Sequence, residues 1–321
     1  MIVRQTSLNM VYELAKQDER VVFIGSELVA GTLKKFKQDM PDRFFMEGVS
    51  EANIVGLAAG LALEGKIPYV NTIATFFARR AYEQIVLDMC LHKAKVRLMA
   101  SGGGLVYAPL GPTHLAIEDI SVLRTIPNLT IVAPCDADEM RRLMLLTLDY
   151  PGPIYIRLAK GGDPIISRSD PPFQIGKAIL LREGSDALVI ATGICSKLAM
   201  DAATELASQG LEASVLHVHT IKPLDTAAID QGIQRVPVIV SIEENVTIGG
   251  LGGAVAEIIA EASLDRPKRF ARIGIPDVFP HQYGSQASLM EAFQITTQNL
   301  VDKVMKLSTQ SYRSTPESLR K

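Results

Sequence analysis

Apolar residues along this chain alternate between helical and strand spacing. The spacing from Ser7 to Gln17 predicts a helix, and the β-branched and aromatic run Val21 to Ile24 predicts the strand that follows it. The alternation continues through apolar runs at Ile67 to Ile73 and Val96 to Ala100. Because strands that are apolar almost throughout are typical of parallel sheets covered by helices on both faces, we expect an α/β protein.

The alternation is interrupted once and then restarts. Gly161 to Phe173 (GGDPIISRSDPPF) is rich in Pro, Gly and charge, which is typical of an interdomain linker. We therefore expect two α/β domains, each a mostly parallel sheet flanked by helices, at residues 1–162 and 176–307 with a linker at 163–175. The polar residues 308–321 are predicted to form a disordered tail.

One acidic residue, Glu51, follows a predicted strand-to-helix turn. Gly48-Val49-Ser50 forms that turn, with Ser50 as the candidate N-cap and Glu51 in the first helical turn. The helix is apolar from Ile54 to Leu63, which predicts burial on most sides. An acid at this position is commonly explained by the helix dipole. A carboxylate on a buried helix, however, needs a dedicated partner, because burying an ionised group is costly.

The stretch PDRFFMEGVSEANIVGLAAGLA, which contains Glu51, resembles the pyrimidine-binding domain of transketolases. In that family a Gly-Ile/Val-x-Glu turn precedes an Ala-Ala-Gly-Leu-Ala helix. The resemblance implies that the cofactor is thiamine diphosphate and that Glu51 hydrogen-bonds N1′ of its aminopyrimidine. The proton shared there favours the imino tautomer, whose N4′ removes the proton from C2 of the thiazolium.

Two further segments resemble cofactor-binding parts of this family. ATFFARRAYEQ resembles the segment whose aromatic side chains stack on the aminopyrimidine, so Phe76 is the matching residue and Phe77 the alternative if the register slips by one. Arg79 is the neighbouring polar candidate, and a solvent-exposed helix start is its alternative explanation. Glu27 follows the first strand, at the sheet edge where open α/β sheets bind ligands, but the family has an aspartate there. Gly31 stands where the family has a serine.

The block GPTHLAIEDISVLRTIPNLTIVAPCDADEM resembles one shared by transketolases and 1-deoxyxylulose-5-phosphate synthases. The resemblance implies that His114 faces the substrate oxygens beside the thiazolium. Leu110 and Gly102 depart from the family pattern, since an aspartate and a histidine that read the substrate stand near these positions. The preceding glycines at 102–104 do not form a phosphate-binding Walker pattern and favour a flexible active-site loop.

Three basic residues are candidates for contacts with a substrate phosphate. Arg4 and Lys160 match positions where the family or its relatives hold a phosphate-binding arginine, and Arg157 precedes Lys160 on the same predicted strand. Solvent-exposed charges at a chain end and at a strand end are the alternative explanation for all three.

The second half of the chain resembles the transketolase C-terminal domain through HTIKPLD, EEN and GGLGGAV. Its glycines do not indicate a dinucleotide site, because no acid follows at the fitting distance after a strand. IPDVFPHQYGSQ, at Ile275–Gln286, is similar to the deoxyxylulose phosphate synthase form of this domain.

The Gly-Asp-Gly motif with which transketolases bind the metal and the diphosphate is absent from this chain. The resemblance covers only the latter half of the family, which implies the C-terminal, beta-type subunit of a split transketolase. Such a subunit would transfer a two-carbon ketol unit between sugar phosphates or related sugars. A partner subunit would supply the diphosphate-binding domain and hold Mg²⁺, in an α2β2 complex, and the apolar helix at Ile54–Leu63 is the expected interface.

Two other functions stay open at this point. One is carboligation with pyruvate, as in deoxyxylulose phosphate synthases, and the other is a non-catalytic regulatory or binding subunit with the same fold.

Composition narrows the partners and the compartment. A net charge of −2 gives no reason to expect nucleic acid or an acidic membrane surface as a partner. The three cysteines lack metal spacing and suit a reducing compartment, and MIVRQTSLNM has no apolar signal-peptide core. We expect a cytoplasmic protein without a membrane span.

Overall fold

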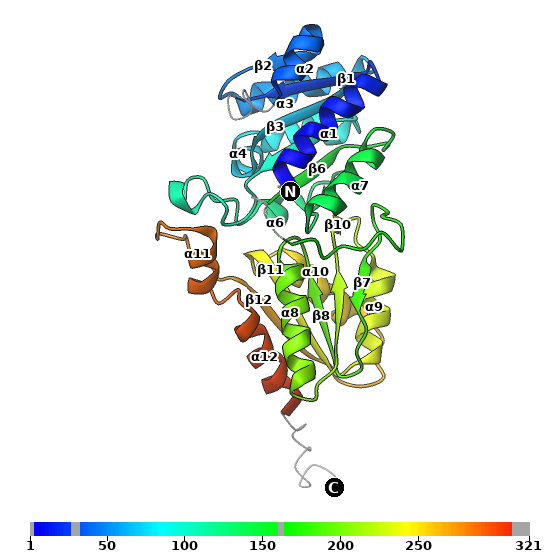
Figure 1. Cartoon of the computed structure of the whole chain (residues 1–321), viewed down its shortest axis with the longest axis vertical. Coiled ribbons are helices and arrows are strands. Elements are labelled where there is room, and N and C mark those ends of the chain that lie inside the picture. Colours follow the sequence, from blue (N-terminus) through cyan, green and yellow to red (C-terminus); the bar gives the residue numbers. More distant parts are fainter. Residues whose placement is uncertain (1–2, 27–32, 160–163, 310–321) are drawn as a thin grey trace.

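The computed structural model describes residues 3–26, 33–159 and 164–309, which form two α/β units stacked along the long axis (Figure 1). The first contains α1 (Val3–Gln17), β1 (Val21–Gly25), α2 (Lys34–Asp39), η2 (Pro41–Arg43), β2 (Phe44–Met46), α3 (Glu51–Leu63), β3 (Ile67–Ile73), α4 (Ala74–Arg80), α5 (Tyr82–Gln84), the π-helical η3 (Ile85–Leu91), β4 (Arg97–Ser101), η4 (Ala108–Leu110), α6 (Asp119–Leu123), β5 (Thr130–Val132), α7 (Ala137–Thr147) and β6 (Ile154–Leu158).

The second unit contains β7 (Ile179–Arg182), β8 (Ala187–Ala191), α8 (Cys195–Ser208), β9 (Ala213–His217), β10 (Thr220–Lys222), α9 (Thr226–Arg235), β11 (Val238–Val246), α10 (Leu251–Glu261), β12 (Arg269–Ile275), α11 (Gln286–Ala292) and α12 (Thr297–Thr309). The predicted class, two α/β domains with mostly parallel sheets between helices, is confirmed.

The first sheet has the order β10-β5-β6-β4-β3-β1-β2 within the described residues. All neighbouring strands in this sheet are parallel except the pair at one edge, β10 and β5, which is antiparallel. Strand β10 comes from the second half of the chain. A strand contributed by the second half therefore extends the sheet of the first, which ties the two units together through backbone hydrogen bonds.

Alternate residues of each strand enter different cores, as the twofold periodicity of strands requires. On β1, Phe23 packs on the side of α1 and α7, whereas Ile24 packs with the apolar residues of α3 and α4. The second sheet, ordered β12-β11-β8-β9-β7, divides in the same way: Val189 faces α8 and α12, and Leu188 faces α9 and α10. The central strands of both sheets are buried on both faces, which explains why they are almost continuously apolar, whereas the edge strands β7 and β12 are partly exposed.

The described parts of the predicted linker and tail are more ordered than their composition suggests. The backbone N–H groups of Ile166 and Ser167 donate to Asp136 Oδ2 at 2.9 and 2.7 Å, and Phe173 is buried. Helix α12 extends to Thr309, so Ser308 and Thr309 are helical instead of belonging to a disordered tail. Residues 310–321 lie outside the described residues.

No helix in the described ranges combines the length and the apolar character that crossing a membrane requires.

Candidate active site

A cavity of about 460 Å³ opens at the carboxyl edge of the first sheet. Its walls come from the ends of β1 and β3, the start of α3, helix α4 and the loop before α6: Ser26, Val49, Glu51, Thr72, Ile73, Phe76, Arg80, Thr113 and His114. Ligands of open α/β sheets bind at this edge. Three of the predicted site residues, Glu51, Phe76 and His114, therefore meet in one cavity.

Glu51 begins α3 and is only 3% exposed. Its Oε1 accepts a hydrogen bond from Thr72 Oγ1 at 3.3 Å, and its Oε2 pairs with Arg80 Nη1 at 3.1 Å. Ser50 holds the N-cap position, but its hydroxyl donates to the Glu47 carbonyl at 3.0 Å and makes no cap. The acid is thus a buried carboxylate with a cationic partner, which goes beyond a helix-dipole effect.

Phe76 forms the aromatic wall of the cavity. Its ring centroid lies 5.3 Å from that of His114 at an interplanar angle of 64°, and the Arg80 guanidinium carbon lies 3.9 Å from the Phe76 centroid. The Nδ1 of His114 is 2.8 Å from Thr113 Oγ1, a contact that restrains the orientation of the imidazole. Carboxylate, imidazole, guanidinium and an aromatic face are therefore presented to the same space.

The alternative register for the aromatic residue is not realised. Phe77 is fully buried in the core formed with α3 and η3, and it does not line the cavity. Helix α4 starts at Ala74, directly after β3, with no loop between them. That immediate start turns Phe76 toward the cavity and Phe77 toward the sheet.

Arg80, which sequence reasoning missed, takes the place that we expected for Arg79. The Arg79 side chain pairs with Glu118 and donates to the Leu115 carbonyl at 3.3 Å, so it fastens the segment after His114 to α4 and does not line the cavity. Residues four apart share a helix face. Given Phe76 in the cavity wall, that spacing points to Arg80.

Arg157 lies in an ion pair at the junction of the two units and not in the cavity wall. Its Nε and Nη2 pair with the Asp119 carboxylate at 2.9 Å, and Nη2 also donates to the Glu244 carbonyl at 2.9 Å. Burial alone would lower the pKa of Arg157, but the Asp119 carboxylate outweighs burial and raises it. Arg157 therefore links the two units, because it bonds to Asp119 of the first unit and to the Glu244 carbonyl of the second. The second unit covers the end of β6, where Arg157 lies.

Arg4 lines a second hollow, of about 260 Å³, together with Gly102, Val106, Tyr107, Pro109, Leu110 and Ala159. Arg4 and Leu110 thus share one wall, next to the loop that leads to His114. Glu27 and Lys160, the other two predicted ligands, lie outside the described residues, as does Gly31.

The glycines at 102–104 are explained by close packing. A Cβ on Gly102 would lie 2.0 Å from the Tyr107 ring, and one on Gly104 would lie 2.4 Å from Glu244 Cδ. The peptide group after Gly104 is also held, because Leu105 N donates to Glu244 Oε1 at 2.7 Å. The loop is packed against the second unit, which differs from the flexible loop that we expected.

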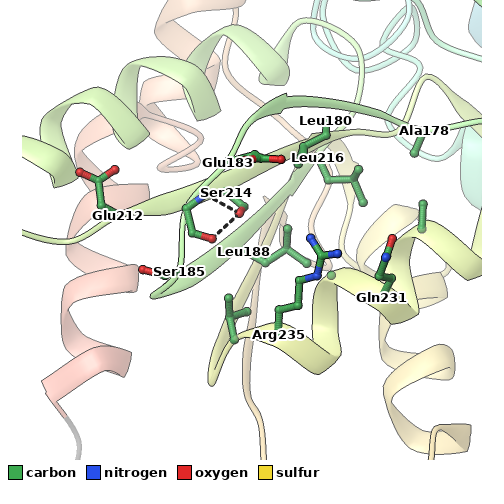
Figure 2. Close-up of a pocket in the computed structure, with 14 residues that line it drawn as sticks. Ala178, Leu180, Glu183, Ser185, Leu188, Glu212, Ser214, Leu216, Gln231 and Arg235 are labelled. Atoms are coloured by element: carbon green, nitrogen blue, oxygen red, sulfur yellow. Dashed lines mark hydrogen bonds between the residues drawn. The ribbon is translucent and has the colours of Figure 1, made fainter. Parts of the chain in front are cut away.

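A further hollow of about 500 Å³ lies in the second unit, between β7, β9 and α9 (Figure 2). Leu188, Leu216 and Arg235 are among its lining residues, and the lining residue Ser214 hydrogen-bonds to the backbone N–H and carbonyl of Gly184 at 2.9 and 2.7 Å (Figure 2). It contains none of the predicted site residues, so the first cavity is the candidate active site.

Comparison with known proteins decides the family. Residues 1–162 match the family model described as transketolase, pyrimidine binding domain, and residues 176–300 match the transketolase, C-terminal domain. The chain belongs to the transketolase family. The predicted family, with its pyrimidine-binding and C-terminal domains, is therefore confirmed.

Relatives of this transketolase-family chain include subunits of split enzymes. The 6-deoxy-6-sulfo-D-fructose transketolase subunit of Clostridium sp. is 38% identical over 93% of this chain and 92% of its own length. One of the subunits of the apulose-4-phosphate transketolase of Phocaeicola vulgatus is 36% identical over 85% of this chain and 87% of its own. The 1-deoxy-D-xylulose-5-phosphate synthase of Desulfotalea psychrophila is 39% identical over 90% of this chain but only 45% of its own.

A solved structure of a split-gene transketolase, described as an inactive β4 tetramer, superposes with a TM-score of 0.87 at 33% identity and covers 96% of this transketolase-family chain and 99% of its own. The two relatives named as subunits match over most of their own length, whereas the synthase extends well beyond the matched part.

Proposed function

We propose that this chain is the C-terminal, beta-type subunit of a split, thiamine-diphosphate-dependent transketolase. The observation that carries the proposal is the buried Glu51 carboxylate, set beside the Phe76 ring and His114 in one cavity. A group that can hold a proton at low dielectric, next to an aromatic face, fits an aminopyrimidine. The fit extends to Ser26, whose buried hydroxyl lines the cavity without a hydrogen-bond partner in the described residues.

Each residue of the cavity has a separate task in this proposal. Thiamine diphosphate, when bound, supplies the carbanion chemistry of ketol transfer. Glu51 holds and shares the proton at N1′, and Phe76 supports the pyrimidine ring by stacking. His114, restrained by Thr113, donates hydrogen bonds to substrate oxygens. Arg80 pairs with Glu51 and lies over one face of the Phe76 ring, which keeps a positive charge beside the cavity.

We further propose that a second polypeptide binds the diphosphate and Mg²⁺, in an α2β2 complex. Two observations support this: relatives spanning the same two domains are named as subunits, and the β4 assembly of a split-gene relative is described as inactive. The cytoplasm is the proposed compartment, since the three cysteines, all in described segments, are buried and free.

The substrates that we propose are ketoses and aldoses with an anionic terminus. The relatives are named for a sulfonated sugar and for a sugar phosphate, so an anion is common to both. A terminus of this kind needs a cation near the cavity, and Arg80 and Arg4 line the two neighbouring hollows.

The deciding experiment is reconstitution with the diphosphate-binding subunit. Ketol transfer from a ketose phosphate should require both chains and thiamine diphosphate, while the isolated chain should be inactive. Carboligation with pyruvate is the second candidate, favoured by the synthase relative. It is the route that releases carbon dioxide, so carbon dioxide from the reconstituted pair with pyruvate, without ketol transfer, would replace our proposal. Assembly without either activity would favour a regulatory subunit.

A further inference from the structure

Three side chains with metal-binding atoms meet at the junction of the two units, away from the candidate active site. Cys135 precedes α7, Glu139 lies in the first turn of α7, and His217 ends β9 of the second unit. One ligand atom from each lies within 4.8 Å of the others, and all three residues are buried. The cluster therefore joins residues that are far apart in the sequence and come from both domains.

The hydrogen bonds around the cluster already orient its ligand atoms. His217 Nε2 lies 2.9 and 3.1 Å from the two carboxylate oxygens of Glu139, while its Nδ1 lies 2.6 Å from Ser196 Oγ. The Cys135 backbone N–H donates to Glu139 Oε2 at 2.6 Å. Metal-bound histidines are held in the same way, with the second ring nitrogen bonded to a neighbouring group that sets the tautomer.

The donor set selects the kind of ion. Thiolate sulfur, imidazole nitrogen and one carboxylate oxygen are ligands typical of Zn²⁺, whereas Mg²⁺ and Ca²⁺ are bound by oxygen alone. Three protein ligands leave a fourth tetrahedral position. His219 is a candidate for it: its ring centroid lies 5.6 Å from that of His217, and its buried Nε2 has no hydrogen-bond partner among the described residues.

The donor set can balance the charge of a divalent ion. Zn²⁺ with one thiolate, one carboxylate and one neutral imidazole sums to zero, which avoids the cost of an isolated interior charge. The thiolate is the form of cysteine that binds metal, so binding displaces the Sγ proton of Cys135.

We propose that Cys135, Glu139 and His217 form a site for Zn²⁺ that fastens the two domains of the chain together. The site is independent of ketol transfer, because none of its residues lines the candidate active-site cavity. Its effect is on domain docking, since Cys135 and Glu139 belong to one unit and His217 to the other.

The test uses Co²⁺ as a spectroscopic probe on the full chain after removal of metals with a chelator. Co²⁺ should bind once per chain and give the near-ultraviolet charge-transfer band of a thiolate ligand, and Zn²⁺ should abolish that band and raise the thermal unfolding temperature. Cys135→Ser should lose the band and the thermal shift. Cys90→Ser, which removes a buried thiol outside the cluster, should keep both.

Two results would overturn the proposal. One is a wild-type chain that gives no thiolate band at millimolar Co²⁺, and the other is a band that survives in Cys135→Ser. If Cys135→Ser does not fold, His217→Gln serves as the second variant, and a wild-type band in folded His217→Gln would equally exclude the site. His219→Ala tests the fourth ligand, because a cobalt visible spectrum unchanged from wild type would leave that position to water.

Discussion

Glu51 shows how one residue can satisfy a local rule and still be placed for another purpose. Its position in the first turn of α3 agrees with the helix dipole, yet its carboxylate is buried and bonded to Thr72 and Arg80. Burial, a cationic partner and an adjacent aromatic ring are features of a site that handles a proton.

Replacing Glu51 by Gln should slow deprotonation of cofactor C2 by roughly a hundredfold or more, the usual effect of losing a general acid–base group. The fold should be kept, because the amide retains the shape and can still accept the hydrogen bond from Thr72. Hydrogen–deuterium exchange at C2 in the reconstituted complex measures this step. His114→Ala is the matched control and should leave the exchange rate near that of wild type while impairing later steps with substrate. A wild-type exchange rate in Glu51→Gln would assign the residue to helix stability alone.

Substitutions of Phe76 and Phe77 should have different effects, one mainly on cofactor affinity and the other mainly on the free energy of unfolding. Phe77→Ala removes a fully buried ring and should lower the free energy of unfolding by about 3–5 kcal/mol. Phe76→Ala alters a partly exposed cavity wall, so it should lower cofactor affinity roughly tenfold, as expected for one lost stacking contact of about 1–1.5 kcal/mol, with a smaller loss of stability. Urea unfolding and calorimetric titration of thiamine diphosphate onto the reconstituted complex measure the two effects. The reverse pattern would place the cofactor against Phe77.

At the scale of elements, α3 is less buried in the isolated chain than its composition predicts. One face packs in the core through Ile54, Val55, Ala58 and Ala59, but Leu57 and Leu63 are 37% and 60% exposed. Helix η3 packs beside α3 and exposes Leu87 and Leu91 at 46% and 67%. An exposed apolar surface over two adjacent helices is typical of an interaction site. It supports the proposed partner contact through α3 and extends it to η3.

Introducing charge on this surface should weaken assembly without unfolding the chain. Leu57→Asp and Leu91→Asp should each raise the dissociation constant for the partner subunit about tenfold or more, since burying one leucine contributes about 1.5–3 kcal/mol. Leu145→Asp, on α7, is the control, because Leu145 is 55% exposed on a different helix. Size-exclusion chromatography and titration with the partner test the prediction. Equal weakening by all three variants would point to general destabilisation instead.

At the scale of the whole molecule, the two units are held together by buried polar groups. Glu244 of the second unit accepts a hydrogen bond from Leu105 N of the first. Its neighbour Glu243 is bonded within the second unit, where it accepts from the N–H groups of Leu251 and Gly252 at 2.8 and 2.7 Å. A Cβ on Gly250 would lie 2.2 Å from Glu243 Oε2, so the glycines of GGLGGAV allow the helix to approach this carboxylate. Burial raises the pKa of Glu243 and Glu244 to about 7 each.

The raised pKa values predict that stability falls as pH rises from 5 to 8. In the folded protein, Glu243 and Glu244 keep their protons up to a pH of about 7. In the unfolded chain, they have the ordinary glutamate pKa of 4.5 and have already lost these protons in this pH range. Stability is therefore lost through this window, by about 1.4 kcal/mol for each unit of pKa difference per residue. Glu244→Gln should flatten the dependence. Urea unfolding at pH 5.5 and pH 8 measures it, and an unchanged slope in Glu244→Gln would exclude this carboxyl as a cause.

Local order along the chain was predictable because it depends on spacing between near neighbours. The apolar runs predicted β3 at Ile67–Ile73 to the residue, and the motif around Glu51 indicated the family and a candidate catalytic acid. His114 and Phe76 were also identified from motifs, since each is read with its flanking residues. These features can be recognised in the sequence because a helix or strand period and a short motif are properties of adjacent positions.

Contacts between distant segments were decided only by the tertiary structure. Nothing near Arg157 in the sequence indicates that Asp119 and the second domain cover it, and the pairing of β10 with β5 joins residues about ninety positions apart. The choice of Arg80 over Arg79, the exposed side of α3 and the meeting of Cys135, Glu139 and His217 also depend on which surfaces pack together. Sequence by itself predicted the alternation of helices and strands, the family and the candidate acid Glu51, because these follow from local periods and motifs. Burial and partnership of charged groups were settled by packing, because the free energy of a charge depends on all that surrounds it, whatever its position in the chain.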